Sequence, residues 1–149
     1  MNNRQYALFG PVIFFLLHCI GCTHQAYVGS TKSYKDIAVI NDSSTLSLRL
    51  DRASIAAVDD KRWRLSAWTM PAKVEVLPGQ HSVAIYCWHG FEPSSNAGLQ
   101  GRLKSVNFNA QTGHDYQVYC TIKDGRYVRW IKDLTTGEIV AGIDNQPAL

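Results

Sequence analysis

The 149-residue sequence lacks an apolar run long enough to hold the chain in a membrane as a spanning helix. Its longest run, from Ala7 to Ile20, would rise about 21 Å as a helix at roughly 1.5 Å per residue. The hydrocarbon core of a bilayer is roughly 30 Å thick. A transmembrane anchor is therefore the less favoured interpretation of this segment.

Catalytic and metal-binding motifs are also missing. The sequence has no Gly-x-Ser-x-Gly elbow, no glycine-rich phosphate loop and no His-x-x-x-His or His-Glu-x-x-His pair. His81 follows a predicted turn, where we expect it to form local contacts, whereas His89 and His114 lie beside predicted loops, where we expect solvent. We therefore predict a protein that is not an enzyme and has no cofactor and no metal site.

Charge is neither abundant nor concentrated. The chain carries 15 basic and 12 acidic residues, a formal net charge of +3, and has no long block of one sign. Nucleic-acid binding requires a concentrated basic face. We therefore expect no nucleic-acid partner.

The N-terminus has the three parts of an export signal. Arg4 supplies a positive charge before the apolar run, no acid accompanies it, and the small residue Gly21 closes the segment. The sequence therefore predicts a signal peptide over residues 1–21. A soluble secreted product, cut elsewhere, is the alternative.

The end of this signal, Leu17 to Cys22, resembles the lipobox of bacterial lipoproteins, in which a small residue precedes a lipidated cysteine. Cys19 stands where the family usually has Leu, so the match is imperfect. The resemblance implies that Cys22 is the first mature residue and carries the lipid. Thr23, in place of the Asp that retains lipoproteins in the inner membrane, implies the periplasmic face of the cell outer membrane.

Two cysteines remain in the 128 residues that follow residue 21. Cys87 and Cys120 both end alternating apolar runs, and in an oxidising compartment an even pair favours a disulfide. Strands that lie side by side would bring the two Cα atoms within the roughly 4.4–6.8 Å that a bridge needs. Two isolated cysteines supply too few ligands for a metal site.

Alternation of apolar and polar residues predicts an all-β domain over residues 36–143. Residues 22–35 are polar and are predicted to be a lipidated tether, and residues 144–149 a C-terminal tail. The clearest predicted hairpin joins 73–77 to 80–88 through Pro78-Gly79. The other predicted strands are 36–40, 46–50, 54–58, 61–65, 103–110, 115–122, 127–131 and 138–140.

Three segments resemble a group of small bacterial lipoproteins of unknown function: Asp59 through Val83, the strand starting at Asp115-Tyr116, and Trp130 through Val140. The turn Pro78-Gly79-Gln80-His81 also resembles that of PEGA-type surface-layer domains. The resemblance implies a single immunoglobulin- or transthyretin-like antiparallel β-sandwich. It brings no catalytic residues with it.

The most concentrated basic and aromatic stretch is Lys61, Arg62, Trp63 and Arg64. Arginine binds carboxylates and phosphates in a two-pronged fashion, so this stretch is a candidate site for an anionic glycan, lipid phosphate or acidic protein. The alternative is an edge strand whose charges prevent sheet-to-sheet aggregation, with the tryptophan packed beneath.

Trp88 and Phe91, beside the long loop 89–101, are a second candidate partner-binding pair, or else they cover the end of the sandwich. Together these features predict a lipid-anchored periplasmic protein with a non-enzymatic structural or binding role. We expect its partners to be the membrane, through Cys22, and an envelope protein or glycan. The alternative is an inhibitor or immunity protein that inserts Phe91 to Leu99 into a cell-wall-attacking enzyme.

Overall fold

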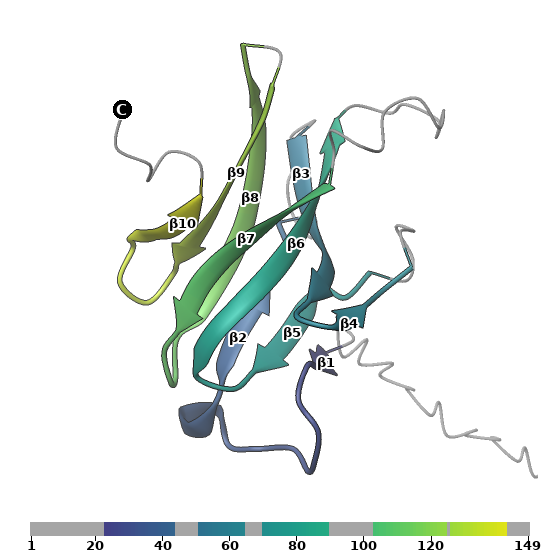
Figure 1. Ribbon diagram of the computed structural model, residues 1–149. Helices are drawn as coiled ribbons and strands as arrows, with labels where there is room; N and C mark the ends of the chain where they lie inside the picture. The colour runs from purple at the N-terminus through teal and green to yellow at the C-terminus, as the bar shows by residue number, and fades with distance from the viewer. Residues whose placement is uncertain (1–22, 44–50, 65–69, 90–102, 125, 143–149) are drawn as a thin grey trace, which may run out of the picture.

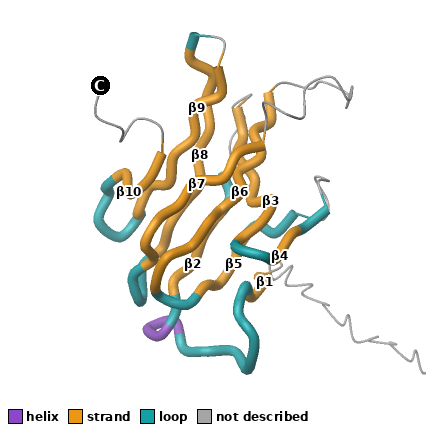
Figure 2. Tube along the Cα trace, viewed as in Figure 1, coloured by secondary structure: helices purple, strands orange, loops and turns teal. Residues whose placement is uncertain are grey.

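Two β-sheets face each other across a shared core in the computed structural model (Figure 1). The structure describes residues 23–43, 51–64, 70–89, 103–124 and 126–142. Within them, strands are joined by turns and by one short 3-10 helix, η1 (Tyr34–Asp36), as the colouring of Figure 2 shows. The predicted all-β class and the two-layer arrangement are confirmed. No helix of the described part is long and apolar enough to span a membrane.

The first sheet has six strands in the order β1-β5-β2-β8-β9-β10. The β1–β5 and β2–β8 pairs are parallel and the other pairs are antiparallel, so the prediction of an antiparallel sandwich is wrong for this sheet. Parallel neighbours cannot be joined by a tight turn, and here the chain crosses the other sheet between β2 and β8. The strands are β1 (Thr23–Gln25), β5 (Lys73–Val76), β2 (Ala38–Asn41), β8 (Asp115–Lys123), β9 (Arg126–Asp133) and β10 (Ile139–Gly142).

The second sheet has four strands in the order β4-β3-β6-β7, and all its pairs are antiparallel. A bulge at Ala56 in β3 shifts the register between Ile55 and Ala57. The strands are β4 (Lys61–Arg62), β3 (Asp51–Val58), β6 (Gly79–His89) and β7 (Leu103–Ala110).

Alternation decides which side chains enter the core. On β6, Val83, Ile85 and Cys87 are fully buried between the sheets, and the intervening residues point to the outer face. On β8, Tyr116 and Val118 are buried in the same core. On each of these strands the alternate apolar residues therefore share one face of the sheet, which is the face turned to the core.

The predicted hairpin of 73–77 with 80–88 is wrong. β5 and β6 follow one another along the chain, but β5 lies in the six-stranded sheet and β6 in the four-stranded sheet. Pro78-Gly79 therefore carries the chain between the layers, and Gly79 has the positive φ (129°) that favours glycine. β8 and β9, in contrast, do form a hairpin, because Lys123 pairs with Arg126.

The predicted tether is also wrong from Thr23 onward. Thr23–Gln25 forms β1 and pairs in parallel with β5. The Tyr27 hydroxyl then donates to Glu75 Oε2 over 3.1 Å, and the Tyr34 hydroxyl to Asp115 Oδ2 over 3.0 Å. Backbone groups of a polar segment can complete a sheet edge as well as those of an apolar one, and this is why composition did not reveal the strand.

Several predictions concern residues outside the described part. These are the signal peptide, Cys22, the strand at 46–50, Phe91 with most of the 89–101 loop, and the tail at 144–149.

Candidate functional site

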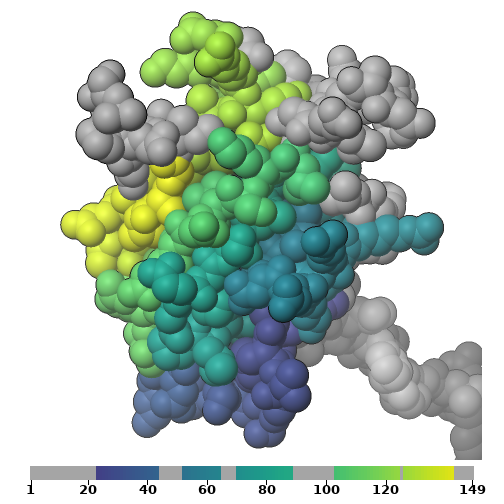
Figure 3. All heavy atoms as spheres, in the orientation of Figure 1, coloured from purple at the N-terminus to yellow at the C-terminus, as the bar shows by residue number. Residues whose placement is uncertain are grey.

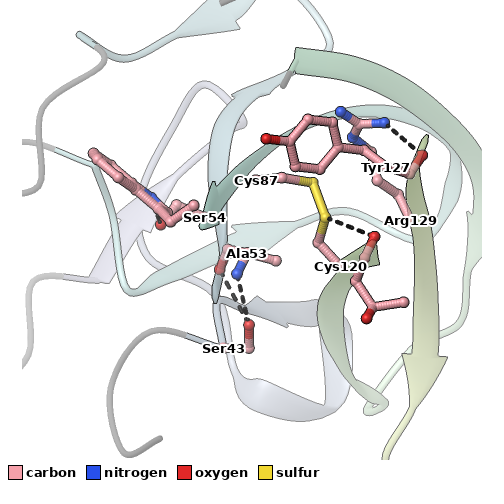
Figure 4. The surroundings of a disulfide bond; sticks show 9 residues. Ser43, Ala53, Ser54, Cys87, Cys120, Tyr127 and Arg129 are labelled. Carbon is pink, nitrogen blue, oxygen red and sulfur yellow. Dashed lines mark hydrogen bonds between the residues drawn. A yellow bond between two sulfur atoms is a disulfide. The ribbon is translucent and has the colours of Figure 1, made fainter. Parts of the chain in front are cut away.

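The disulfide between Cys87 and Cys120 is formed, with the two Cα atoms 5.9 Å apart. It joins β6 of one sheet to β8 of the other, so the bridge crosses the core rather than linking neighbouring strands (Figure 4). The predicted pair is confirmed. Because the two sulfurs are bonded to each other, neither cysteine is available as a nucleophile or a metal ligand.

Arg129 lies beside this bridge and is almost completely buried (Figure 4). Its guanidinium stands over the Tyr127 ring at 5.5 Å and donates to the Tyr127 carbonyl over 3.2 Å. Burial lowers the pKa of Arg129, although a guanidinium stays charged at neutral pH. The disulfide and Arg129 are thus engaged in contacts within the domain.

His81 joins two turns. Its Nδ1 lies 2.7 Å from Asp59 Oδ2 and its Nε2 lies 2.6 Å from the Leu77 carbonyl oxygen. The local contacts predicted for His81 are confirmed, and the longer-range partner Asp59 adds a link between the β3–β4 turn and the β5–β6 connection.

His114 is not the solvated side chain that the sequence predicts. It is largely buried, its ring stacks on Tyr116 with centroids 6.1 Å apart, and its Nδ1 lies 2.7 Å from Asp133 Oδ2. Burial by itself would raise the pKa of Asp133. The bond from His114 and the N–H groups of Thr135 and Thr136 outweigh that effect, and the pKa is lowered overall.

These His–Asp contacts do not assemble a metal site. Among the described residues, no three His, Cys, Asp or Glu side chains are placed to hold a metal ion together. The side chain of His89 lies outside the description.

The predicted basic and aromatic stretch lies at the edge of the four-stranded sheet, because β4 has a neighbour on one side only. Lys61 Nζ donates to the Gln25 carbonyl of β1, and the Trp63 ring meets the His24 ring edge-on with centroids 5.9 Å apart. The edge-strand alternative is therefore correct for the position of β4. Lys61 and Trp63, two of the four candidate residues of this stretch, therefore contact β1 of the same chain.

Arg62 lies over the outer face of the four-stranded sheet, the face turned away from the core. Pairing places Arg62 opposite Ala57, Ala57 opposite Ala84, and Ala84 opposite Ser105, so small side chains form a row across the sheet. These small residues leave a hollow of about 480 Å³ on the face turned to the viewer in Figure 3. The hollow is lined by Ala56, Ala57, Asp59, Arg62, Trp63, Ser82, Ala84, Leu103, Lys104 and Ser105.

The charge in this hollow is unbalanced toward positive. The acidic residue that lines the hollow is Asp59, and its carboxylate is already bonded to His81 and, over 2.9 Å, to the backbone N–H of Ser82. Arg62 is exposed and has no anionic partner among the described residues. A guanidinium beside an aromatic ring, above a floor of small side chains, suits a carboxylate-bearing chain.

Trp88 lies on the same outer face, further along β6. Its indole N–H donates to Ser54 Oγ over 3.0 Å, and its ring meets Tyr86 edge-on with centroids 4.8 Å apart. Trp88 is half-buried, so it extends the face that contains the hollow. The structure therefore brings Arg62, Trp63 and Trp88 to one face of the sandwich.

A second hollow, of about 550 Å³, lies between β7 and the β8–β9 hairpin. Lys104, Lys123 and Arg126 line it together with one carboxylate, Asp124. Sequence reasoning missed this basic group because its members come from three separate strands. The pairing of β8 with β9 brings Lys123 and Arg126 side by side, and Lys104 joins them from β7.

No protein-family model, no curated protein and no solved structure matches the chain.

Proposed function

We propose that this chain is a lipid-anchored protein of the periplasm with a non-enzymatic binding role, and that the hollow beside Arg62 and Trp63 binds an anionic envelope partner. One observation carries the proposal: an exposed, unneutralised guanidinium and an aromatic ring flank an open floor of small side chains on a two-sheet domain. Such a surface binds and positions a ligand without offering a nucleophile.

The proposed address has two supports. A core disulfide is typical of proteins that fold in oxidising compartments such as the bacterial periplasm. The lipobox-like end of the signal supports a lipid on Cys22, and Thr23 after it supports the periplasmic face of the outer membrane. The resemblance carried by Asp59 through Val83, by Asp115-Tyr116 and by Trp130 through Val140 leads us to propose a kinship with small lipoproteins and with PEGA-type, immunoglobulin- or transthyretin-like sandwiches.

The proposed function can be tested by crosslinking in the intact envelope. A photoreactive residue at Ser105, which lines the hollow, should capture one recurrent envelope protein or glycan. Asn109 is an exposed control on the same face of β7, outside the hollow. Equal capture from the two positions would contradict the assigned site.

A charge variant tests the role of Arg62. Loss of a charge-assisted hydrogen bond costs roughly 1.5–3 kcal/mol, so Arg62→Gln should reduce capture from Ser105 by on the order of tenfold or more. Lys132→Gln removes a positive charge from the outer face of the opposite sheet and should leave capture unchanged. A captured cell-wall hydrolase would favour the inhibitor alternative over an envelope scaffold.

A further inference from the structure

β1 begins directly after Cys22, so no linker separates that residue from the sheet. β1 begins at Thr23, whose Cα is bonded through one peptide unit, about 3.8 Å, to that of Cys22. Thr23 pairs directly with Lys73 of β5. A lipid on Cys22 would therefore hold the β5 side of the six-stranded sheet at the level of the lipid headgroups.

The same lipid would also bring β4 to the membrane. β4 is fixed to β1 by the Lys61–Gln25 hydrogen bond and by the contact of Trp63 with His24. Figures 1 and 2 both show β1 and β4 side by side at the lower right of the molecule. We call this surface, made of β1, residues 59–64, Lys73 and Glu75, the β1–β4 edge.

The β1–β4 edge carries more positive than negative charge. Its cations are Lys61, Arg62, Arg64 and Lys73, and its acids are Asp59, Asp60 and Glu75, which pairs with Gln25 of β1, so the balance is four minus three, or +1. Lys73 is exposed and has no anionic partner among the described residues. Basic residues within a Debye length of an anionic leaflet, about 10 Å at 0.1 M salt, are attracted to it.

We infer that the β1–β4 edge docks on an anionic phospholipid surface, which fixes the orientation of the sandwich on the membrane. The inference rests on the proposed lipidation of Cys22. The occupant is a phospholipid headgroup layer, because the chain that leads out of the domain at this edge would end in lipid. Figures 1 and 2 show the β8–β9 hairpin at the opposite end of the molecule from β1 and β4, so docking through the β1–β4 edge leaves this hairpin away from the membrane.

Lysine acetylation can measure this orientation on the full lipidated protein. The protein is placed in nanodiscs of phosphatidylglycerol mixed with phosphatidylcholine, in nanodiscs of phosphatidylcholine alone, and in a nonionic detergent. The acetylation rate of Lys73 is compared by mass spectrometry with that of Lys123, an exposed lysine at the far hairpin. The same spectra report acyl mass on Cys22.

We expect Lys73 to react about fivefold more slowly in the anionic nanodiscs than in the phosphatidylcholine nanodiscs, since the attraction of one basic residue to an anionic surface corresponds to about that factor. About 1 M salt should remove the difference between the two nanodiscs. Lys123 should react alike in all three. Variant Arg62→Gln should weaken the protection of Lys73, and Lys132→Gln should not.

The outcomes separate the two proposals. Equal rates for Lys73 and Lys123 in anionic nanodiscs, on a chain that carries acyl mass, would overturn the orientation and leave the anchor standing. A chain without acyl mass on Cys22 would overturn the anchor, and the orientation with it. If the acetylation rate of Lys73 is lowered equally in both kinds of nanodisc, the lipid anchor alone holds this edge at the membrane. That result would overturn the proposed attraction to anionic phospholipid.

Discussion

Reduction of the Cys87–Cys120 disulfide should destabilise the sandwich strongly. The bridge closes a loop with a sequence separation of 33 and ties together strands of opposite sheets. On the chain-entropy model, a loop of this length restrains the unfolded chain by about 4 kcal/mol at 25 °C. Small domains have a total stability of only about 5–15 kcal/mol, so reduction should remove between about a quarter and most of the stability.

This loss can be followed by urea unfolding of the purified protein, read by tryptophan fluorescence with and without dithiothreitol. With a urea dependence of about 2 kcal/mol/M, the midpoint should fall by roughly 2 M. The slope should rise on reduction, because the unlinked unfolded chain exposes more surface. The midpoint of thermal unfolding should fall by roughly 12–16 °C for a domain of this size.

The control is the double variant Cys87→Ala with Cys120→Ala, which should match the reduced protein and ignore dithiothreitol. Both positions are buried, so the loss of the two sulfur atoms adds a small packing cost. Identical urea midpoints for the oxidised and reduced wild-type protein would refute the reasoning. They would mean that the bridge restrains little of the unfolded chain.

Three further changes test the packing and the buried charge. The lowered pKa of Asp133 contributes stability above its unfolded value of about 3.9, and this is lost as pH falls through the folded pKa. Asp133→Asn should therefore cost about 2 kcal/mol at pH 7 and flatten the acid limb below about pH 4 in thermal unfolding; an unchanged acid limb would contradict this. Gly142→Ala places a Cβ 2.6 Å from a backbone carbonyl oxygen at a residue with φ 141°, and should lower the free energy of unfolding in urea by about 3 kcal/mol. Gly137→Ala is the control, because Gly137 has a positive φ but no atom within 4 Å of the added Cβ, and it should cost about 1 kcal/mol. Equal costs for the two variants would argue against the clash. Ile85→Ala, in the core, should cost about 2–5 kcal/mol by the same assay, whereas the exposed Leu134→Ala should cost less than about 0.5 kcal/mol; a small effect at Ile85 would contradict its place in the core.

Local pattern was enough to predict which residues of a strand share a face. Val83, Ile85 and Cys87 alternate with less buried neighbours, and a sheet that is covered on one face turns that alternation directly into burial. The Cys87–Cys120 pair followed from cysteine count and compartment alone. These properties depend on short stretches of chain and so can be recognised in the sequence.

The choice of strand partners could not be predicted in the same way. Pro78-Gly79 marks a reversal, but a reversal is equally compatible with a hairpin and with a step to the opposite sheet. β1 joins the sheet through the backbone of three residues, Thr23–Gln25, which is too short for a period to be read. His114 is largely buried and bonded to Asp133, nineteen positions away, a partner that no local pattern reveals.

The candidate site shows the same division. The sequence identified Arg62 and Trp63 as a basic and aromatic stretch. The hollow beside them depends on Ala57, Ala84 and Ser105, small residues of three strands that only the pairing register brings into one row. Small side chains carry no chemical signal of their own, so a concave surface made from them is visible only in the folded chain.

The position of β1 also bears on the order of events during export. If the chain is cut before Cys22 as proposed, the scissile bond lies one residue from a strand that is paired in the sheet. A protease needs that stretch extended and accessible, so cleavage should precede the docking of Thr23–Gln25 onto β5. Until then one edge of the six-stranded sheet stays open, and open edges invite pairing with other chains. Release from the leader and completion of the sheet would thus be coupled, and an uncleaved precursor should aggregate more readily than the mature protein.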